Sequence, residues 1–197
     1  MDKEIALSSV MSVLERGSNF SIDNSEDFNR CFDHVMGLLK DAALLFKSGS
    51  YATSAFMSIA AIEESSKSEL SLCTRRESEN KHRNDPLRDH KKKEIAAAMP
   101  TVAMGGRLVD ALGDERIEEL YELTYSGGLK RLREDALYWD IKNERIELPE
   151  DVVDRALARD LLLFSIEVFD DRLVGYTHYS IEASRTTDEL FQEIADL

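Results

Sequence analysis

The sequence predicts an all-α fold, a helical bundle in one main domain. Three prolines and nine glycines in 197 residues favour helices over a turn-rich β architecture. Long segments repeat their apolar residues at steps of three and four, which is typical of helices with one buried face. A hydrophobic share of 43% with 32% charged residues is typical of a folded, water-soluble chain. We therefore expect an N-terminal arm over residues 1–24 and a single helical-bundle domain over residues 25–197.

The first half of the chain contains the clearest helical pattern. We expect a short helix over residues 1–16 and a polar stretch up to residue 24. The segment 25–47 has apolar residues at alternating steps of four and three, and Ser25 is the expected N-cap. Gly49 ends this helix, and a second one follows over residues 51–76. Such a short connection predicts an antiparallel pair of helices.

The second half is punctuated by Pro and Gly. A helix that begins at Pro86, with Asp85 as its N-cap, is expected to end before Pro100. The remaining helices are predicted over residues 102–125 with a break near Gly113, from residue 149 to a stop at Gly175, and over residues 187–197.

One segment has the alternation of a strand. Trp139 and Ile141, then Ile146 and Leu148, alternate with polar residues around a polar turn. This period of two predicts a short β-hairpin near residues 138–148.

Composition limits the location and the partners. No segment approaches the roughly 18 apolar residues of a membrane span, and the N-terminus lacks the pattern of a secretory signal. Cys31 and Cys73 have no metal-binding or redox spacing, and we expect both to be buried free thiols. A cytoplasmic protein with no membrane association is predicted.

The net charge of −14 argues against general coating of nucleic acids, but the charge is unevenly distributed. The segment 75–93 has eight Lys or Arg against four Asp or Glu, a local charge of +4, so the rest of the chain carries −18. Such a segment either binds a phosphate backbone at one place or is simply a solvated, basic connection between helices.

The helix predicted over residues 51–76 has charged residues where a core helix would be apolar. At 100° per residue, Glu63 lies about 40° and Lys67 about 80° from Ile59, the centre of the apolar stripe, while Glu64 lies about 140° away. A carboxylate on a buried stripe needs a partner. Glu63 and Lys67 have the favourable i, i+4 order of a salt bridge. Alternatively, they form one wall of a polar pocket between helices.

The basic segment also contains the residue types of a ribonuclease. A histidine can transfer protons near neutral pH, and lysine or arginine can stabilise an anionic phosphate. Cleavage of RNA through its own 2′-hydroxyl needs these groups and no metal. Arg83 precedes His90 with six residues between them, and Lys93 follows. Arg75 and Arg76 stand at similar spacing before His82, and Arg172 before His178, so the functional pair stays open.

Three short blocks of the sequence resemble a known family. They are Ala61-Ile62-Glu63-Glu64-Ser65-Ser66-Lys67, then His90-Lys91-Lys92-Lys93, then Ala136-Leu137-Tyr138-Trp139-Asp140 with Pro149 downstream. In type and order they are similar to the AxEExxK, HKxK and ALYxD blocks of the AbiV family of bacterial abortive-infection proteins, which is grouped with the HEPN superfamily. The resemblance spans about residues 35–165. Ser66 stands where family members often have glycine.

This resemblance implies a HEPN-like helical bundle and an anti-phage effector. Many HEPN proteins are metal-independent RNases that act as homodimers through an arginine and a histidine, so the resemblance implies RNA as substrate, a phage-encoded or cellular trigger, no cofactor and no bound metal. Arg83 would then bind the scissile phosphate and His90 would transfer protons. Glu63 and Lys67 would orient the site, with Lys93 near the phosphate. The expected RNA-binding residues are Arg75, Arg76, Lys81, Arg88, Lys91 and Lys92.

Two other classes of function have less support in the sequence. A non-catalytic module that binds the translation machinery or a phage protein is the alternative, with Glu63, Lys67 and His90 as a buried structural network. A di-iron bundle needs two Glu-x-x-His motifs on facing helices, and the sequence has one, from Glu79 to His82. Motifs of nucleotide hydrolases, serine hydrolases and zinc proteases do not occur.

Overall fold

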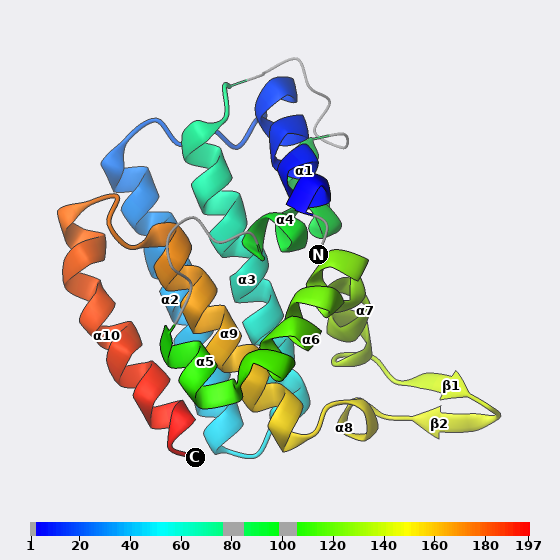
Figure 1. The fold of residues 1–197 in the computed structure, drawn as a ribbon. Coiled ribbons are helices and arrows are strands. Elements are labelled where there is room, and N and C mark those ends of the chain that lie inside the picture. The colour runs from blue at the N-terminus through cyan, green and yellow to red at the C-terminus, as the bar shows by residue number, and fades with distance from the viewer. Residues whose placement is uncertain (1–2, 77–84, 99–105) are drawn as a thin grey trace.

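A computed structural model describes residues 3–76, 85–98 and 106–197 (Figure 1). Helices account for most of the described residues, and two short strands form a single antiparallel hairpin. This confirms the predicted all-α bundle with a small hairpin. In chain order the elements are α1 (Lys3–Arg16), α2 (Ser25–Lys47), α3 (Tyr51–Cys73), the 3₁₀ turn η2 (Pro86–Arg88), α4 (His90–Ala97), α5 (Gly106–Leu112), α6 (Asp114–Ser126), α7 (Gly128–Asp135), β1 (Asp140–Lys142), β2 (Arg145–Glu147), α8 (Pro149–Val152), α9 (Arg155–Leu173) and α10 (His178–Ala195).

The long helices α2, α3, α9 and α10 build the main core. Gly49, with φ of +84°, makes the tight turn between α2 and α3, which then run antiparallel. Helix α9 packs against both, and α10 packs against α9 and α2. The rings of Phe32 and Phe169 meet in this core with centroids 4.7 Å apart. Burial of such large apolar side chains is the main stabilising contribution of the bundle.

Helix α3 is the central element of the fold. Helices α2, α9, α4 and α7 all pack against it. It is therefore enclosed on several sides, and even charged side chains such as Glu63 and Glu69 are buried. Each of these carboxylates needs a cation from a neighbouring helix.

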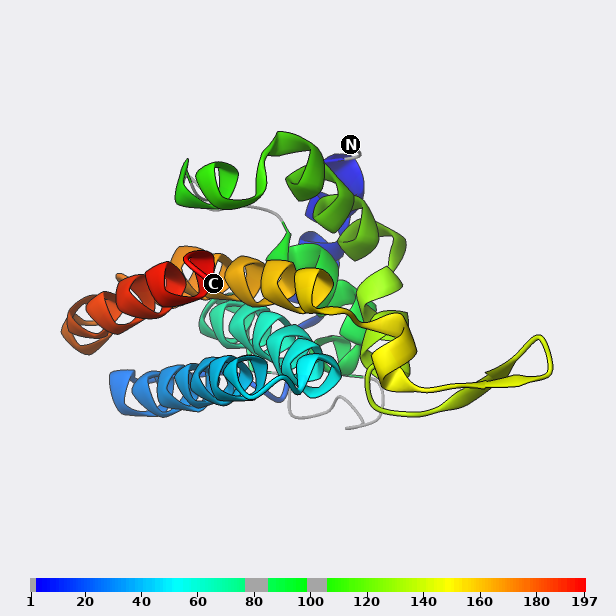
Figure 2. The ribbon, with the colours of Figure 1, turned by 90° about the horizontal axis from the view of Figure 1, so that it is seen from below.

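The shorter helices form a second layer, as the view in Figure 2 shows. Helix α5 packs against α9, and α6 contacts α5, α7 and α4. Helix α1 lies against α4 and α3, where Val13 is buried with Leu70 and Leu87. The hairpin β1–β2 leaves this layer and projects from the body (Figure 2).

The N-caps of two helices differ from the prediction. Helix α2 begins at Ser25, but its N-cap is Asn24, whose side chain accepts a hydrogen bond from the Asp27 amide. Asp85 caps only the turn η2, whereas α4 begins at His90 with Asp89 as its cap. His90 is therefore the first residue of its helix. A Pro at N1 is compatible with a 3₁₀ turn as well as with an α-helix, and the sequence pattern does not separate the two.

Two helices differ more strongly from the prediction. Helix α7 was not predicted, because in eight residues it buries only Leu129 and Leu132, too short a run for a repeated apolar stripe. Helix α10 begins at His178 rather than at residue 187, and Thr177 and Ser180 form a capping box at its start. The first half of α10 is polar, so the apolar pattern that marks a helix appears only in its second half.

Both cysteines are free, as expected, but Cys31 is half-buried and Cys73 is exposed, so the prediction of buried thiols is wrong. No helix among the described residues is long and apolar enough to cross a membrane.

Candidate functional site

A buried carboxylate on α3 is the centre of the candidate site. Glu63 is 2% exposed. Its Oε2 lies 2.6 Å from His90 Nδ1 and 3.0 Å from Lys93 Nζ, both on α4. Arg133 Nη1 on α7 donates to Oε1 at 3.0 Å and to Oε2 at 3.2 Å. Three cationic or protonatable side chains from two further helices therefore converge on one carboxylate, which is how a buried charge is tolerated.

This arrangement fixes the orientation of the His90 ring. Arg133 Nη1 also lies 3.1 Å from His90 Nδ1, but a carboxylate held by Lys93 and Arg133 can only accept, so we assign the proton of the short contact with Glu63 to His90 Nδ1. The His90 side chain remains 40% exposed, and its Nε2 makes no hydrogen bond to any described residue. A histidine held through Nδ1 by a carboxylate, with Nε2 open, is arranged to exchange protons with a bound molecule.

A second carboxyl group lies beside this centre. Glu94 on α4 is fully buried, and neither of its carboxyl oxygens has a hydrogen-bond partner. Burial and the neighbouring Glu63 carboxylate raise the pKa of Glu94 to about 7. The site therefore holds two carboxyl groups, Glu63, which is paired with Lys93 and Arg133, and Glu94, whose pKa lies near neutral pH.

Lys67 lies one helical turn after Glu63 on α3, but its ammonium group turns to Glu64 and does not reach Glu63. Its Nζ pairs with Glu64 Oε2 at 2.8 Å, in i, i+3 spacing, so the predicted Glu63–Lys67 salt bridge is not formed. The pKa of Glu64 is lowered, because the hydrogen bond and charge of Lys67 outweigh the effect of burial. Lys93 lies 3.6 Å from Glu64 and so connects the two pairs. Lys67 therefore acts on Glu63 only indirectly, through Glu64 and Lys93.

A pocket of about 550 Å³ lies on the Lys67 side. It is formed between the segment 20–22, α2 and α3, and Glu64, Lys67, His34 and Cys31 are among its lining residues. The acidic and basic side chains in it are paired, Glu64 with Lys67 and Asp27 with Arg30. Its mixed, internally paired charges do not identify a ligand.

Two buried polar anchors position α4. Asp85, just before it, accepts hydrogen bonds from Ser18 Oγ at 2.8 Å, the Asn19 amide at 2.7 Å and the Leu87 amide at 3.0 Å. At the other end, Arg172 of α9 donates to the carbonyl of Ala96 and pairs with Glu69 of α3. These contacts fix both ends of the short helix, and with it His90 and Lys93.

The predicted RNA-binding residues have different surroundings. Arg83 and Lys81 lie outside the described residues, so the Arg83–His90 pair is not tested by the structure. Arg76 donates a hydrogen bond to Asp23, which lies just before α2, and Arg88 lies over the ring of Phe20. The other three predicted RNA-binding residues are also placed: Lys92 donates to Ser12 of α1, the Lys91 side chain runs along Gly127, and the Arg75 carbonyl accepts from the Ser18 amide.

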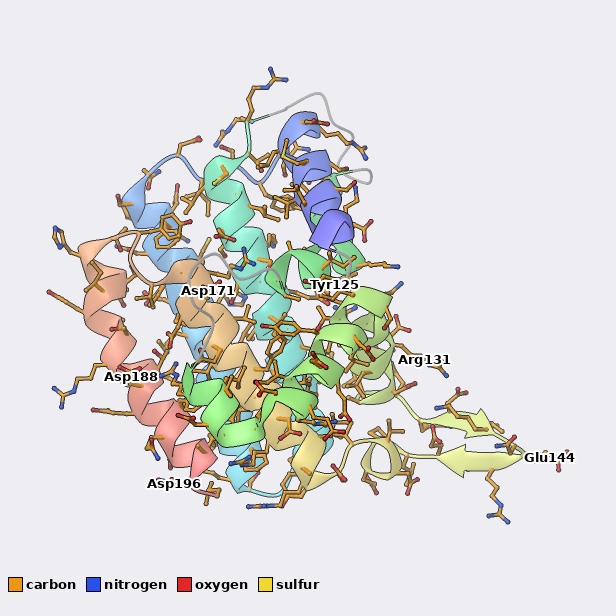
Figure 3. The ribbon with its side chains drawn as sticks, viewed as in Figure 1. Tyr125, Arg131, Glu144, Asp171, Asp188 and Asp196 are labelled. Atoms are coloured by element: carbon orange, nitrogen blue, oxygen red, sulfur yellow. The ribbon has the colours of Figure 1, made fainter. Side chains whose placement is uncertain are left out.

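Arg133 is the site residue that the sequence reasoning missed. A signal for it exists, because Lys130, Arg131 and Arg133 form a second basic run just before the Ala136-Leu137-Tyr138-Trp139-Asp140 block. Without the helix α7, nothing in the sequence placed this run beside His90. Arg131, labelled in Figure 3, points outward from α7 and lies 3.8 Å from Asp135 of the same helix.

Comparison with known families adds the evolutionary context. The family model described as AbiV, of the HEPN group, matches residues 26–168 of the 197. The chain belongs to the AbiV family. The match confirms the resemblance and the HEPN superfamily assignment, and it indicates a role in abortive infection, an anti-phage function. Searches of curated proteins and of solved structures find no significant match.

The AbiV match includes every element of the site. Glu63, His90, Lys93, Glu94 and Arg133 all fall within it, whereas α1 and α10 lie outside. No group of three His, Cys, Asp or Glu among the described residues is arranged to hold a metal ion. At Glu63 the positions that a metal would need are taken by Lys93 and Arg133. The positive charge at this carboxylate is thus supplied by protein side chains.

Proposed function

We propose that this AbiV protein is an abortive-infection effector that cleaves RNA without a metal ion. One observation carries the proposal: His90 is held through Nδ1 by a buried carboxylate while its ring stays partly open to solvent. A purely structural histidine gains nothing from a half-exposed ring, whereas a general base needs access to its substrate.

The proposed reaction uses the 2′-hydroxyl of RNA as nucleophile. His90 Nε2 accepts the proton of that hydroxyl as its oxygen attacks the adjacent phosphorus. The bond from phosphorus to the 5′-oxygen breaks, and the leaving oxygen takes a proton from solvent. The products are a 2′,3′-cyclic phosphate and a 5′-hydroxyl end. Glu63 stabilises the imidazolium that His90 becomes and keeps Nε2 turned outward.

Arg133 is the proposed phosphate-binding group among the described residues. Within the described part of the chain, Arg133 is hydrogen-bonded through Nη1 alone, to Glu63 and 3.1 Å from His90 Nδ1, which leaves the rest of the guanidinium for a phosphate oxygen beside His90. Lys93 is buried on Glu63 and acts on the site through that carboxylate. Arg83 remains a proposed second phosphate ligand, since the family motif implies an arginine before the histidine.

The cellular setting follows from the same proposal. RNA cleavage that halts gene expression takes place in the cytoplasm, acts as a toxin to the infected cell and needs a trigger that appears with the phage. A homodimer would place two such sites in one particle. The alternative is a non-catalytic module, in which the Glu63 network only stabilises the fold and the effector acts by binding another protein.

Toxicity in cells separates these two functions. We expect His90→Ala to abolish the growth arrest during phage infection, while its melting temperature stays close to that of the wild type because the ring is partly exposed. His178→Ala, on the exposed start of α10, is the matched control and should remain toxic. Growth arrest that survives His90→Ala in a folded protein would favour the binding module.

A further inference from the structure

Two exposed aromatic side chains stand next to each other just after α7. Tyr138 is 66% and Trp139 61% exposed, the highest values of any aromatic residue among those described. The next most exposed rings, Tyr176 and Tyr179, each donate a hydrogen bond to a carboxylate. Within the described part of the chain, the side chains of Tyr138 and Trp139 have no such partner and no ring or cation contact. Two large flat surfaces are therefore open to a ligand.

These rings lie close to Arg133, the proposed phosphate-binding group. The Ala136 amide donates to the Leu132 carbonyl at 2.8 Å, and the Tyr138 amide donates to the carbonyl of the residue four positions earlier at 3.0 Å. The helical turns of α7 thus continue as far as Tyr138. At a rise of about 1.5 Å per residue, Tyr138 follows Arg133 by roughly 7–8 Å along the helix axis. A stacked strand of nucleic acid advances about 3.4 Å per nucleotide, so one strand can reach the rings about two nucleotides away from a phosphate at Arg133.

Exposed cations surround α7. The Lys91 side chain runs along Gly127, the N-cap of this helix. Lys130 and Arg131 are exposed on the helix itself, and Arg131 points outward with its side chain 76% exposed (Figure 3). Its contact with Asp135 is long, 3.8 Å, so a phosphate can compete for the guanidinium. Helix α7 therefore offers the positive charge that a nucleic-acid backbone requires.

The charge of the whole chain restricts how a nucleic acid can bind. A net charge of −14 repels a phosphate backbone from most of the surface. Binding to such a protein needs a contribution that does not depend on charge alone, and the stacking of bases on aromatic rings supplies it. In a duplex the bases are paired and stacked on one another, so a flat ring reaches only an unpaired base. Two open rings beside cations, on an acidic chain, therefore fit a single strand better than a duplex.

We propose that Tyr138 and Trp139 form a base-stacking subsite for single-stranded RNA. The subsite holds an unpaired base of the strand whose phosphate is bound at Arg133, with Lys130 and Arg131 on neighbouring phosphates. It determines specificity and takes no part in proton transfer. Its role rests on the proposed RNA cleavage and narrows the substrate to unpaired RNA.

Trp139 is the only tryptophan of the chain, so its fluorescence reports stacking directly. The purified chain is titrated with a single-stranded RNA of about ten nucleotides, methylated at every 2′-oxygen so that it lacks the nucleophile and stays intact. The same strand annealed to its complement is the second probe. Because both rings are exposed in this structure, binding needs no trigger. We expect the single strand to quench Trp139 and the duplex to leave most of the signal unchanged.

Substitutions separate stacking from charge. Tyr138→Leu with Trp139→Leu removes both flat faces and should weaken binding of a labelled single strand, measured by fluorescence anisotropy, by roughly 5- to 100-fold. Tyr138→Phe with Trp139→Phe retains two rings and should bind almost as tightly as the wild type. Lys130→Gln with Arg131→Gln should weaken binding and reduce its dependence on salt concentration. Lys40→Gln, at an exposed position on α2, is the matched control and should change neither.

Cleavage is scored separately, with the unmodified strand and protein recovered from phage-infected cells. A chain that stacks the methylated strand but leaves the unmodified one intact would refute the proposed cleavage and support the subsite. Trp139 fluorescence that the single strand does not affect, equal affinity for the duplex, or full affinity in the leucine variant would each overturn the subsite, whether or not RNA is cut.

Discussion

Replacement of Glu94 by glutamine tests the electrostatics of the site in isolation. Glutamine has the shape of a protonated glutamic acid and cannot ionise, so Glu94→Gln mimics the protonated form of a fully buried group whose oxygens lack partners. The pKa of Glu94 is raised from 4.5 to about 7, because of burial and the nearby Glu63 carboxylate. The folded protein thus binds a proton that the unfolded chain has released at the same pH.

The sign and size of the effect follow from this difference. Between pH 4.5 and 7 the folded state holds more protons than the unfolded state, so the free energy of unfolding falls as the pH rises through this window. A difference of about 2.5 pKa units corresponds to roughly 3 kcal/mol. We therefore expect Glu94→Gln to be about as stable as the wild type near pH 4.5 and more stable by up to roughly 3 kcal/mol above pH 8.

Urea denaturation at several pH values measures this quantity. Burial also raises the pKa of Asp170, to about 6, so the wild-type curve alone contains more than one contribution. The difference between wild type and Glu94→Gln isolates Glu94. Glu118→Gln, at an exposed position on α6, is the control and should follow the wild type at every pH. A Glu94→Gln variant that is less stable at pH 8, or shifted equally at all pH values, would refute the reasoning.

Two further predictions concern buried ion pairs. Lys93→Met should lower the free energy of unfolding by about 2–4 kcal/mol, because it removes a buried cation from Glu63. Lys67→Met, at a partly exposed pair, should lower it by less than about 1 kcal/mol. Equal losses in chemical denaturation would contradict the assigned pairing. Arg172→Met should cost about 3–5 kcal/mol by leaving Glu69 buried without its cation, and the double variant with Glu69→Met should regain most of it in the same assay.

The sequence predicted the helices with long apolar stripes far better than the short ones. The stripe of α2 marks one buried face, and its bounds are those predicted. Helix α7 has no such stripe, because only Leu129 and Leu132 anchor it, and the polar half of α10 is held by its cap rather than by periodicity. Short elements whose stability comes from tertiary contacts leave little signal in a single sequence.

The pairing of charged residues in the candidate site was also only partly predictable from the sequence. Helical geometry placed Glu63 on a buried face, which is confirmed. The i, i+4 rule then suggested Lys67 as its partner, but α3 is enclosed by α4 and α7, and their cations reach Glu63 instead. Local spacing describes only one helix, whereas a buried charge is neutralised by whichever helix packs against it. Arg133, distant in sequence from Glu63, could be identified only from the fold.

The central claim is that His90, held by Glu63, takes part in RNA cleavage without a metal. Its most direct test recovers wild-type protein and His90→Ala from phage-infected cells and incubates each with RNA in excess EDTA. The account predicts that the wild type cuts the RNA and leaves 2′,3′-cyclic phosphate ends, and that His90→Ala leaves it intact. Equal cleavage by both proteins, or intact RNA with a wild-type protein that still arrests growth, would contradict it.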